Sequence, residues 1–226
     1  MSDKTLNLTA IAIFLMMLSV LVGPFVQLSP LVPAIATVTV LGVVTWDQVG
    51  WQGRVGNLVM GLLASKEHQQ RILHHEAGHF LAAYYLGIPV KGYTLSVWET
   101  FQQGKPGLGG VEFDTEDLKN RLQQQWQDVP LILERFATVW MAGIAAEQLM
   151  YGNAEGGTDD RQQLRTAFAL TQLPAASYQQ KERWALLQAE NLLANHRPEY
   201  DALVQAMTQR LSVADCYQKI QETQVV

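Results

Sequence analysis

The chain has 226 residues, of which 48% are hydrophobic and 16% are charged, and its formal net charge at pH 7 is −5. An acidic chain without a basic stripe argues against nucleic acid as a partner. Its single cysteine, Cys216, excludes an internal disulfide framework and a metal site built from several cysteines.

The apolar excess is concentrated at the N-terminus, where no charged residue occurs between Lys4 and Asp47. A membrane-spanning helix needs about 20 apolar residues, so this stretch is long enough for two spans, over 6–26 and 28–46. A proline-containing break separates the two. We therefore predict a transmembrane helical hairpin over 1–47; a cleaved signal peptide or a buried helix pair is the alternative.

The charges that flank the hairpin predict its orientation. Lys4, Arg54 and Lys66 lie outside it and the connection carries no Lys or Arg, so both termini are expected in the cytoplasm or an equivalent compartment. Residues 48–65 then form an interfacial linker with an apolar face on the bilayer, or a linker helix packed on the domain that follows. That domain, 66–226, has ordinary single-domain size and composition.

The sequence RILHHEAGHFLAAYYLG predicts a helix that begins near Ser65 and ends before Gly87. His75 and His79 are four residues apart, so they share a face, separated by ~40° around the axis and ~6 Å along it. Both imidazoles can therefore reach one tetrahedral zinc ion. Glu76 lies beside that face, where a carboxylate can act as a general base without displacing a water from the ion.

For three other residues of this helix we predict structural roles. His74 points ~100° away from His75, and His68 is ~10 Å along the axis from His79, so both are expected to be solvated or hydrogen-bonded rather than ligands. Gly78 in a helix interior costs ~1 kcal/mol relative to Ala, which close approach of another helix would offset.

Catalytic zinc usually has three protein ligands and a water, so a third donor is needed. One candidate is Glu147, in the strongly apolar helix predicted over 139–152, where a charged group needs a partner. The other is Asp160, which follows Thr158 and Asp159 at a predicted helix start. N-capping is the ordinary role of such residues, and we expect it of Thr158 and Asp159 rather than of Asp160.

These segments resemble the FtsH family of membrane-bound zinc metalloproteases over most of the chain from Lys66 to Gln221. The matching segments are HHEAGHF, the strand-like VKGYTLSV and GLGGVEF, AGIAAEQLMYG, GGTDDRQQLRTA, and the closing helices from ERWALL to CYQKI. The resemblance implies zinc bound by His75, His79 and Asp160, with Glu76 as the base. It also implies that Glu147 hydrogen-bonds a ligand from behind.

The chain departs from that family in three respects. Ile144 stands where the family has an arginine, and Thr158-Asp159 stands where the family has Ser-Asn before the ligand. The only Gly-Lys pair, Gly104-Lys105, precedes Pro106 rather than Ser or Thr, so the chain has no GxxxxGK[ST] phosphate-binding loop and no ATP is expected. The family's ATPase module, which lies between membrane and protease, has no counterpart here.

We therefore predict a mainly α fold, with the transmembrane hairpin followed by a mostly helical zinc-peptidase domain with a small β element. The expected function is an ATP-independent, membrane-anchored zinc metalloendopeptidase that cleaves unfolded or flexible protein segments on the cytoplasmic side. Its partners would be a protein or peptide substrate and the lipid bilayer, and the resemblance is compatible with a homo-oligomer. The alternative is a non-proteolytic membrane scaffold or assembly factor that keeps the peptidase fold but has no need for Glu76.

Overall fold

A computed structural model describes residues 65–102, 110–116, 120, 129–171 and 174–224, together with scattered positions between 13 and 42. The chain divides into two compact units, Met1–Val59 and Met60–Val226, and the elements below all belong to the second unit. In chain order they are α4 (Lys66–Tyr85), β1 (Val90–Thr94), α5 (Val97–Gln102), β2 (Gly110–Phe113), α7 (Val129–Tyr151), α8 (Thr158–Ala169), the short 3-10 helix η2 (Ala175–Ser177), α9 (Tyr178–Asn195), α10 (Arg197–Thr208) and α11 (Val213–Gln224). The predicted mainly helical fold with a small β element is confirmed.

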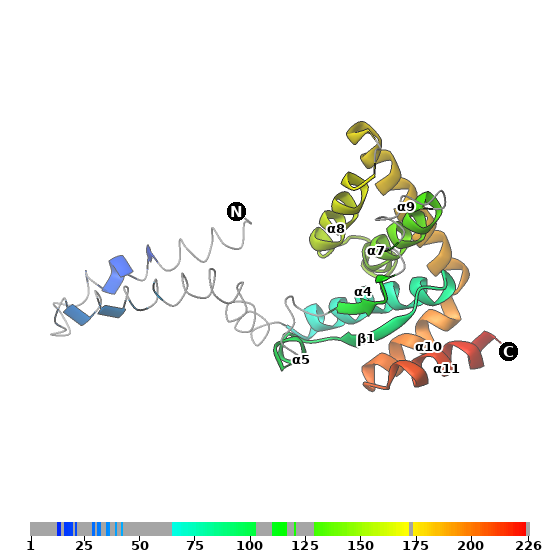
Figure 1. Ribbon diagram of the computed structural model, residues 1–226. Coiled ribbons are helices and arrows are strands. Elements are labelled where there is room, and N and C mark those ends of the chain that lie inside the picture. Colours follow the sequence, from blue (N-terminus) through cyan, green and yellow to red (C-terminus); the bar gives the residue numbers. More distant parts are fainter. Residues whose placement is uncertain are drawn as a thin grey trace. The chain divides into compact units, whose positions relative to one another are not determined.

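Helix α4 is the centre of the second unit, with α7 on one side of it and β1 on the other (Figure 1). It begins where the sequence predicted, because the Ser65 side chain accepts a hydrogen bond from the His68 backbone N–H. It ends at Tyr85, and Gly87 with φ +67° makes the turn into β1. The residues of α4 from His75 to Ala83 are all buried.

The two strands form an antiparallel sheet that packs against α4. Thr94 pairs with Gly110 and Val90 with Phe113, and the register shifts between Val90 and Gly92. Each of the two predicted strand segments therefore contains a strand, but β1 ends at Thr94 and Val97, the last residue of the first segment, begins α5.

The α4–α7 contact is close because small residues line both helices. A Cβ atom on Gly78 would collide with the backbone carbonyl of Ala142 and lie 2.7 Å from the Ala146 Cβ. The expected close approach of a second helix at Gly78 is confirmed, and it brings the backbone of α7 against the histidine-bearing face of α4.

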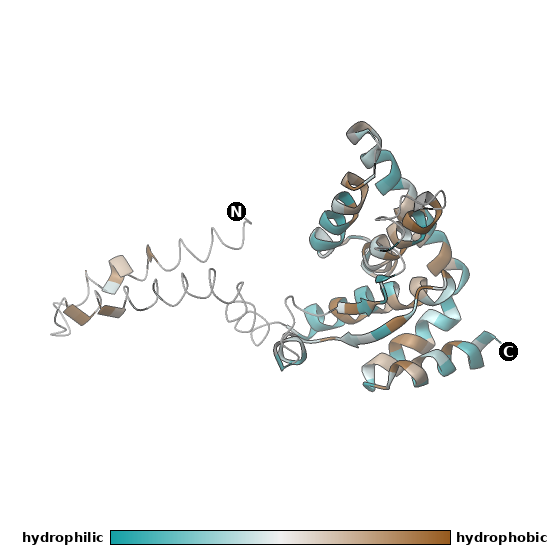
Figure 2. Ribbon diagram, viewed as in Figure 1, coloured by the Kyte–Doolittle hydropathy of each residue, from teal (hydrophilic) through white to brown (hydrophobic). Residues whose placement is uncertain are grey.

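The remaining helices complete the core. Helix α9 packs along α7, and α10 packs on α4 with α11 against it. Helices α8 and α11 carry both hydrophobic and hydrophilic residues around their circumference (Figure 2), as expected of helices with one buried face. Their buried residues are Leu164, Ala167 and Phe168 in α8 and Cys216 and Ile220 in α11.

Most of the predicted hairpin over 1–47, and all of the linker over 48–65 except Ser65, lie outside the described residues. Within the described part of the chain, no helix is both long enough and apolar enough to cross a membrane.

Candidate metal centre

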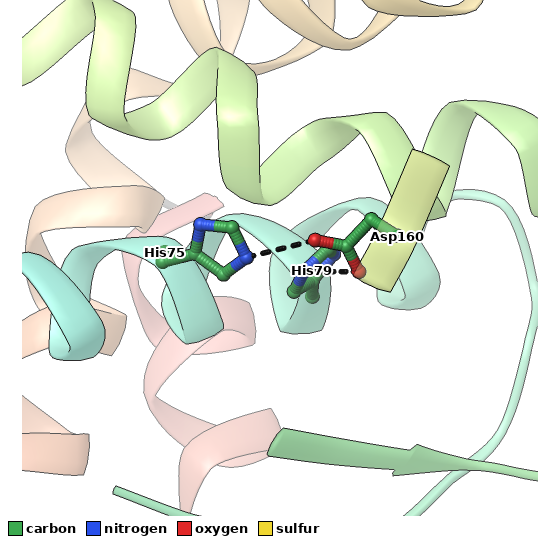
Figure 3. A group of neighbouring side chains, drawn as sticks. All are labelled: His75, His79 and Asp160. Atoms are coloured by element: carbon green, nitrogen blue, oxygen red, sulfur yellow. Dashed lines mark hydrogen bonds and ion pairs between the residues drawn. The ribbon is translucent and has the colours of Figure 1, made fainter. Parts of the chain in front are cut away.

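Three side chains from two helices converge on one point beside α7. His75 and His79 extend from α4, and Asp160 extends from the first turn of α8 with its carboxylate between the two imidazoles (Figure 3). The Asp160 oxygens lie 3.1 Å from His75 Nε2 and 3.3 Å from His79 Nε2. One ligand atom from each of these residues lies within 4.8 Å of the other two.

The hydrogen bonds of the two Nδ1 atoms determine which ring nitrogen bears the hydrogen. His75 Nδ1 donates to Glu147 Oε1 at 2.7 Å, and His79 Nδ1 donates to the Val139 backbone carbonyl at 2.7 Å. Both partners can only accept, so both Nδ1 atoms are protonated. When the rings carry no second proton, as metal binding requires, the Nε2 lone pairs point toward the carboxylate of Asp160.

Two lone pairs and a carboxylate facing one another repel unless a cation lies among them. Ligand atoms 2.0–2.2 Å from a tetrahedral zinc ion are ~3.3–3.6 Å apart, close to the separations between Asp160 and the two rings. Two imidazoles and one carboxylate form a donor set that suits zinc. The residues therefore fit a zinc ion with three protein ligands.

Gly143 of α7 keeps the space beside the two rings open. A Cβ atom at this position would lie 2.5 Å from the Nε2 atoms of both His75 and His79. Any larger residue would thus place its Cβ atom against the two Nε2 atoms that would bind the ion. The absence of a side chain here is explained by the centre as well as by helix packing.

The turn before α8 directs Asp160 toward the histidines. Gly157 has φ +90° and is the N-cap of α8, and a Cβ there would collide with the Ile144 side chain. The prediction that Thr158 and Asp159 cap the helix is wrong, because both already belong to it and no side chain caps it. The turn packs too closely on α7 for a residue other than glycine at the cap, and the two carboxylates, Asp159 and Asp160, lie two and three residues later.

Glu147 lies behind His75 rather than among the converging atoms. It is 2% exposed, and its Oε1 accepts from His75 while its Oε2 accepts from the Glu155 backbone N–H at 2.8 Å. The Gly156 N–H also donates to it. These hydrogen bonds outweigh burial and lower the pKa of Glu147, so it is an anion that orients His75.

Glu76 is buried beside the cluster, and few hydrogen bonds stabilise its negative charge. Its Oε2 has no hydrogen-bond partner among the described residues. Burial raises the pKa of Glu76, although His79, His75 and a hydrogen bond from the Val111 backbone oppose the rise. A carboxylate that is buried, partly unpaired and raised in pKa is the kind of group that takes up a proton.

In the metal-free protein, the carboxylates stabilise the protonated histidines, and the protonated histidines stabilise the carboxylate of Asp160. Burial alone would lower the pKa of His75, but hydrogen bonds to Asp160 and Glu147 raise it to about 10. The pKa of His79 is raised against burial by Asp160. Burial would raise the pKa of Asp160, yet the two imidazoles hold it well below its usual range. The site thus requires positive charge, from protons or from a metal ion.

The other two histidines of α4, His68 and His74, are not in the cluster. His74 Nδ1 lies 2.9 Å from the Tyr200 hydroxyl, which confirms that it is hydrogen-bonded away from the centre. Sequence reasoning missed the Val139 carbonyl and the Gly156 N–H, because backbone groups give no signal of their own in a sequence. It also missed Arg71, whose Nη1 lies 3.8 Å from Glu147 Oε2; the position of Arg71 one turn before His75 on the same face of the helix was a usable signal.

No protein-family model matches the chain, and no curated protein matches it.

Proposed function

We propose that this protein is an ATP-independent, membrane-anchored zinc metalloendopeptidase. The proposal rests on a buried oxygen of Glu76, Oε2, which has no hydrogen-bond partner within the described part of the chain and lies beside the convergence of His75, His79 and Asp160. A structural metal centre needs ligands but no free carboxylate. A hydrolytic centre needs a base next to the ion and outside its ligand shell. The resemblance of the motifs to FtsH proteases supports the same reaction.

Each of these residues would have a separate role in peptide hydrolysis. A zinc ion held by His75, His79 and Asp160 would polarise the scissile carbonyl and make water more acidic. Glu76 takes the proton of the attacking water and returns it to the leaving amine nitrogen. Its raised pKa favours this cycle because the carboxylate can hold the proton between the two transfers. Glu147 keeps the His75 ring fixed throughout.

Strand β2 supports a peptide as the substrate. Its backbone at Val111 hydrogen-bonds Glu76, and the Phe113 ring lies 6.3 Å from the His79 ring, centroid to centroid. Among the described strands, β2 pairs only with β1. An extended substrate segment aligned along the other edge of β2 would run past the proposed base. Only an unfolded or flexible segment can adopt this geometry without a motor.

The membrane anchor is proposed from the N-terminal sequence. The stretch between Lys4 and Asp47 has no charge. Its described residues are mostly helical, and their large apolar side chains, such as Phe14 and Leu21, are exposed. Exposed apolar side chains of helical residues in a charge-free part of the sequence fit a lipid environment better than water. The proposed catalytic domain lies on the cytoplasmic or equivalent side.

The test is metal analysis of the purified full-length chain combined with cleavage of casein, comparing wild type with Glu76→Gln. We expect about one zinc per chain in both proteins, because the base is not a ligand, and cleavage only by wild type. Equal cleavage by the variant would contradict the assignment of Glu76. Zinc-loaded wild type without cleavage of casein or unfolded peptides would favour the scaffold alternative.

A further inference from the structure

Arg71 contacts the proposed metal centre from one turn before His75 on α4. Its guanidinium lies 4.2 Å above the ring centroid of Tyr151, the last residue of α7. One of its nitrogens, Nη1, donates to the Asn153 side-chain oxygen at 3.2 Å, and Nη2 lies 3.8 Å from the Glu155 carboxylate. The side chain is 12% exposed, so it is held between α4 and the end of α7.

These contacts attach α4 to residues 152–157, which we name the α7–α8 turn. The turn is where the chain passes from Glu147 on α7 to Asp160 on α8. Stacking on an aromatic face and a hydrogen bond from a planar guanidinium fix both the distance and the angle of this attachment. Arg71 is thus placed to hold the segment that connects two residues of the centre.

Glu147 is part of the same network. Arg71 Nη1 lies 3.8 Å from Glu147 Oε2, the oxygen that also accepts from the Glu155 backbone N–H. The other oxygen of Glu147 accepts from His75 and from Gly156. A carboxylate buried to this degree needs compensating donors, and the turn supplies two of them.

The turn also lies directly on the His75–Glu147 pair. A Cβ on Gly156 would be 2.6 Å from Glu147 Oε1 and 3.2 Å from His75 Cε1. A small movement of the turn would therefore alter both the hydrogen bond behind His75 and the direction from which Asp160 approaches.

We propose that Arg71 is a positioning residue for the metal centre: it holds the α7–α8 turn against the His75–Glu147 pair and so aims His75 and Asp160 at one ion. The inference rests on the proposed function in that it assumes a metal bound by these residues. Arg71 itself touches neither the ion nor the substrate.

The experiment measures zinc affinity by chelator competition on the full-length chain, comparing wild type with Arg71→Met and Arg197→Met. Arg197 is the matched control because it also lies over a tyrosine ring, Tyr200, and forms an exposed ion pair with Asp201. Loss of groups behind metal ligands weakens affinity by 10–100-fold, so we expect about a tenfold loss for Arg71→Met. Arg197→Met should bind zinc as wild type does.

Hydrogen exchange of the metal-free proteins supplies a readout independent of zinc. The Glu155 and Gly156 amides donate to Glu147, so Arg71→Met should speed their exchange while the amides of α10 and α11 keep their protection. Unchanged zinc affinity together with unchanged exchange at these two amides would overturn the inference, as would an equal loss of affinity in Arg197→Met.

Two further results separate the possible failures. If Arg71→Met does not fold, Arg71→Lys takes its place. Lysine keeps the positive charge but lacks the planar guanidinium that stacks on Tyr151 and donates in several directions. Faster exchange at the two amides and weaker zinc binding are again expected, and wild-type values for both would overturn the inference. If wild type binds no zinc, the proposed function fails, and the exchange data alone still decide whether Arg71 holds the turn.

Discussion

His74 and His75 are neighbours in sequence, yet the two faces of α4 give them opposite environments. At the α4–α7 interface, His75 lies between two carboxylates, and its pKa is raised to about 10. At the α4–α10 interface, His74 donates to the hydroxyl of Tyr200, which in turn donates to the His74 carbonyl. Burial and then the nearby Arg197 lower the pKa of His74.

The difference shows that the partner helix, rather than the residue type, decides what a buried histidine does. Helix α7, the α7–α8 turn and the first turn of α8 bring acceptors, a glycine-lined space and two carboxylates against one face of α4. Helix α10 brings a phenol that satisfies a neutral imidazole. The first interface accumulates negative charge that needs a cation, and the second is already complete without one.

The largest expected effect comes from removing the carboxylate that faces both rings. Asp160→Asn should abolish tight zinc binding, whereas Glu147→Gln should weaken it by about 10–100-fold because Glu147 acts through His75. Asp159→Asn is the matched control, since Asp159 is exposed and outside the cluster, and it should bind zinc normally. Chelator titration measures all three. If Glu147→Gln lost the metal while Asp160→Asn kept it, the two roles would be exchanged.

Filling the space beside the rings should have the next largest effect. Gly143→Ala would place a methyl carbon 2.5 Å from both Nε2 atoms, so zinc affinity should fall sharply even in protein that still folds. Gly110→Ala adds a methyl group where no atom lies within 4 Å and serves as the control. Circular dichroism checks folding, and chelator titration checks the metal. Normal zinc binding by folded Gly143→Ala would show that the ion does not lie at this face.

The raised pKa of His75 predicts a pH dependence of the metal-free protein. A histidine that gains carboxylate partners on folding contributes stability below its unfolded pKa of 6.5, and this contribution is lost as the pH rises toward about 10. The free energy of unfolding, measured with urea across this range, should therefore decline more in wild type than in His75→Gln. Zinc should reduce the decline because the ion takes the place of the protons. Equal declines in the two metal-free proteins would contradict the assignment.

The smallest effect should come from the other face of α4. Tyr200→Phe removes the hydrogen bonds to His74 and should lower the free energy of unfolding by about 1–2 kcal/mol. Zinc affinity should not change, because none of these groups touches the cluster. A loss of zinc affinity in a stably folded Tyr200→Phe protein would show that the two interfaces are coupled.

The sequence predicted those parts of the molecule that depend on local pattern. The helix from Lys66 to Tyr85 follows from the Ser65 cap, the apolar spacing and Gly87. The helix containing Glu147 follows from its apolar pattern in the same way, whereas the two strands were expected from the family resemblance. The four-residue spacing placed His75 and His79 on one face, and the family resemblance pointed to Asp160.

The remaining features depend on contacts between distant segments. Position 157, the N-cap of α8, must be glycine because a Cβ there would collide with the Ile144 side chain. The sequence around residue 157 gives no sign of this contact. The acceptor for His79 is a backbone carbonyl of Val139, and a donor to Glu147 is the backbone of Gly156. Such groups are the same in every residue, so only the fold determines which of them meets a histidine.

Binding of one zinc ion by His75, His79 and Asp160 can be observed by anomalous diffraction from crystals of the zinc-loaded protein, measured on both sides of the zinc absorption edge. We expect a single strong anomalous peak about 2.0–2.2 Å from the Nε2 atoms of both histidines and from one Asp160 oxygen. Glu147 should be hydrogen-bonded to His75 on the side away from the ion. A peak coordinated by Glu147 instead of Asp160, or no peak between the two histidines in zinc-saturated protein, would contradict this assignment.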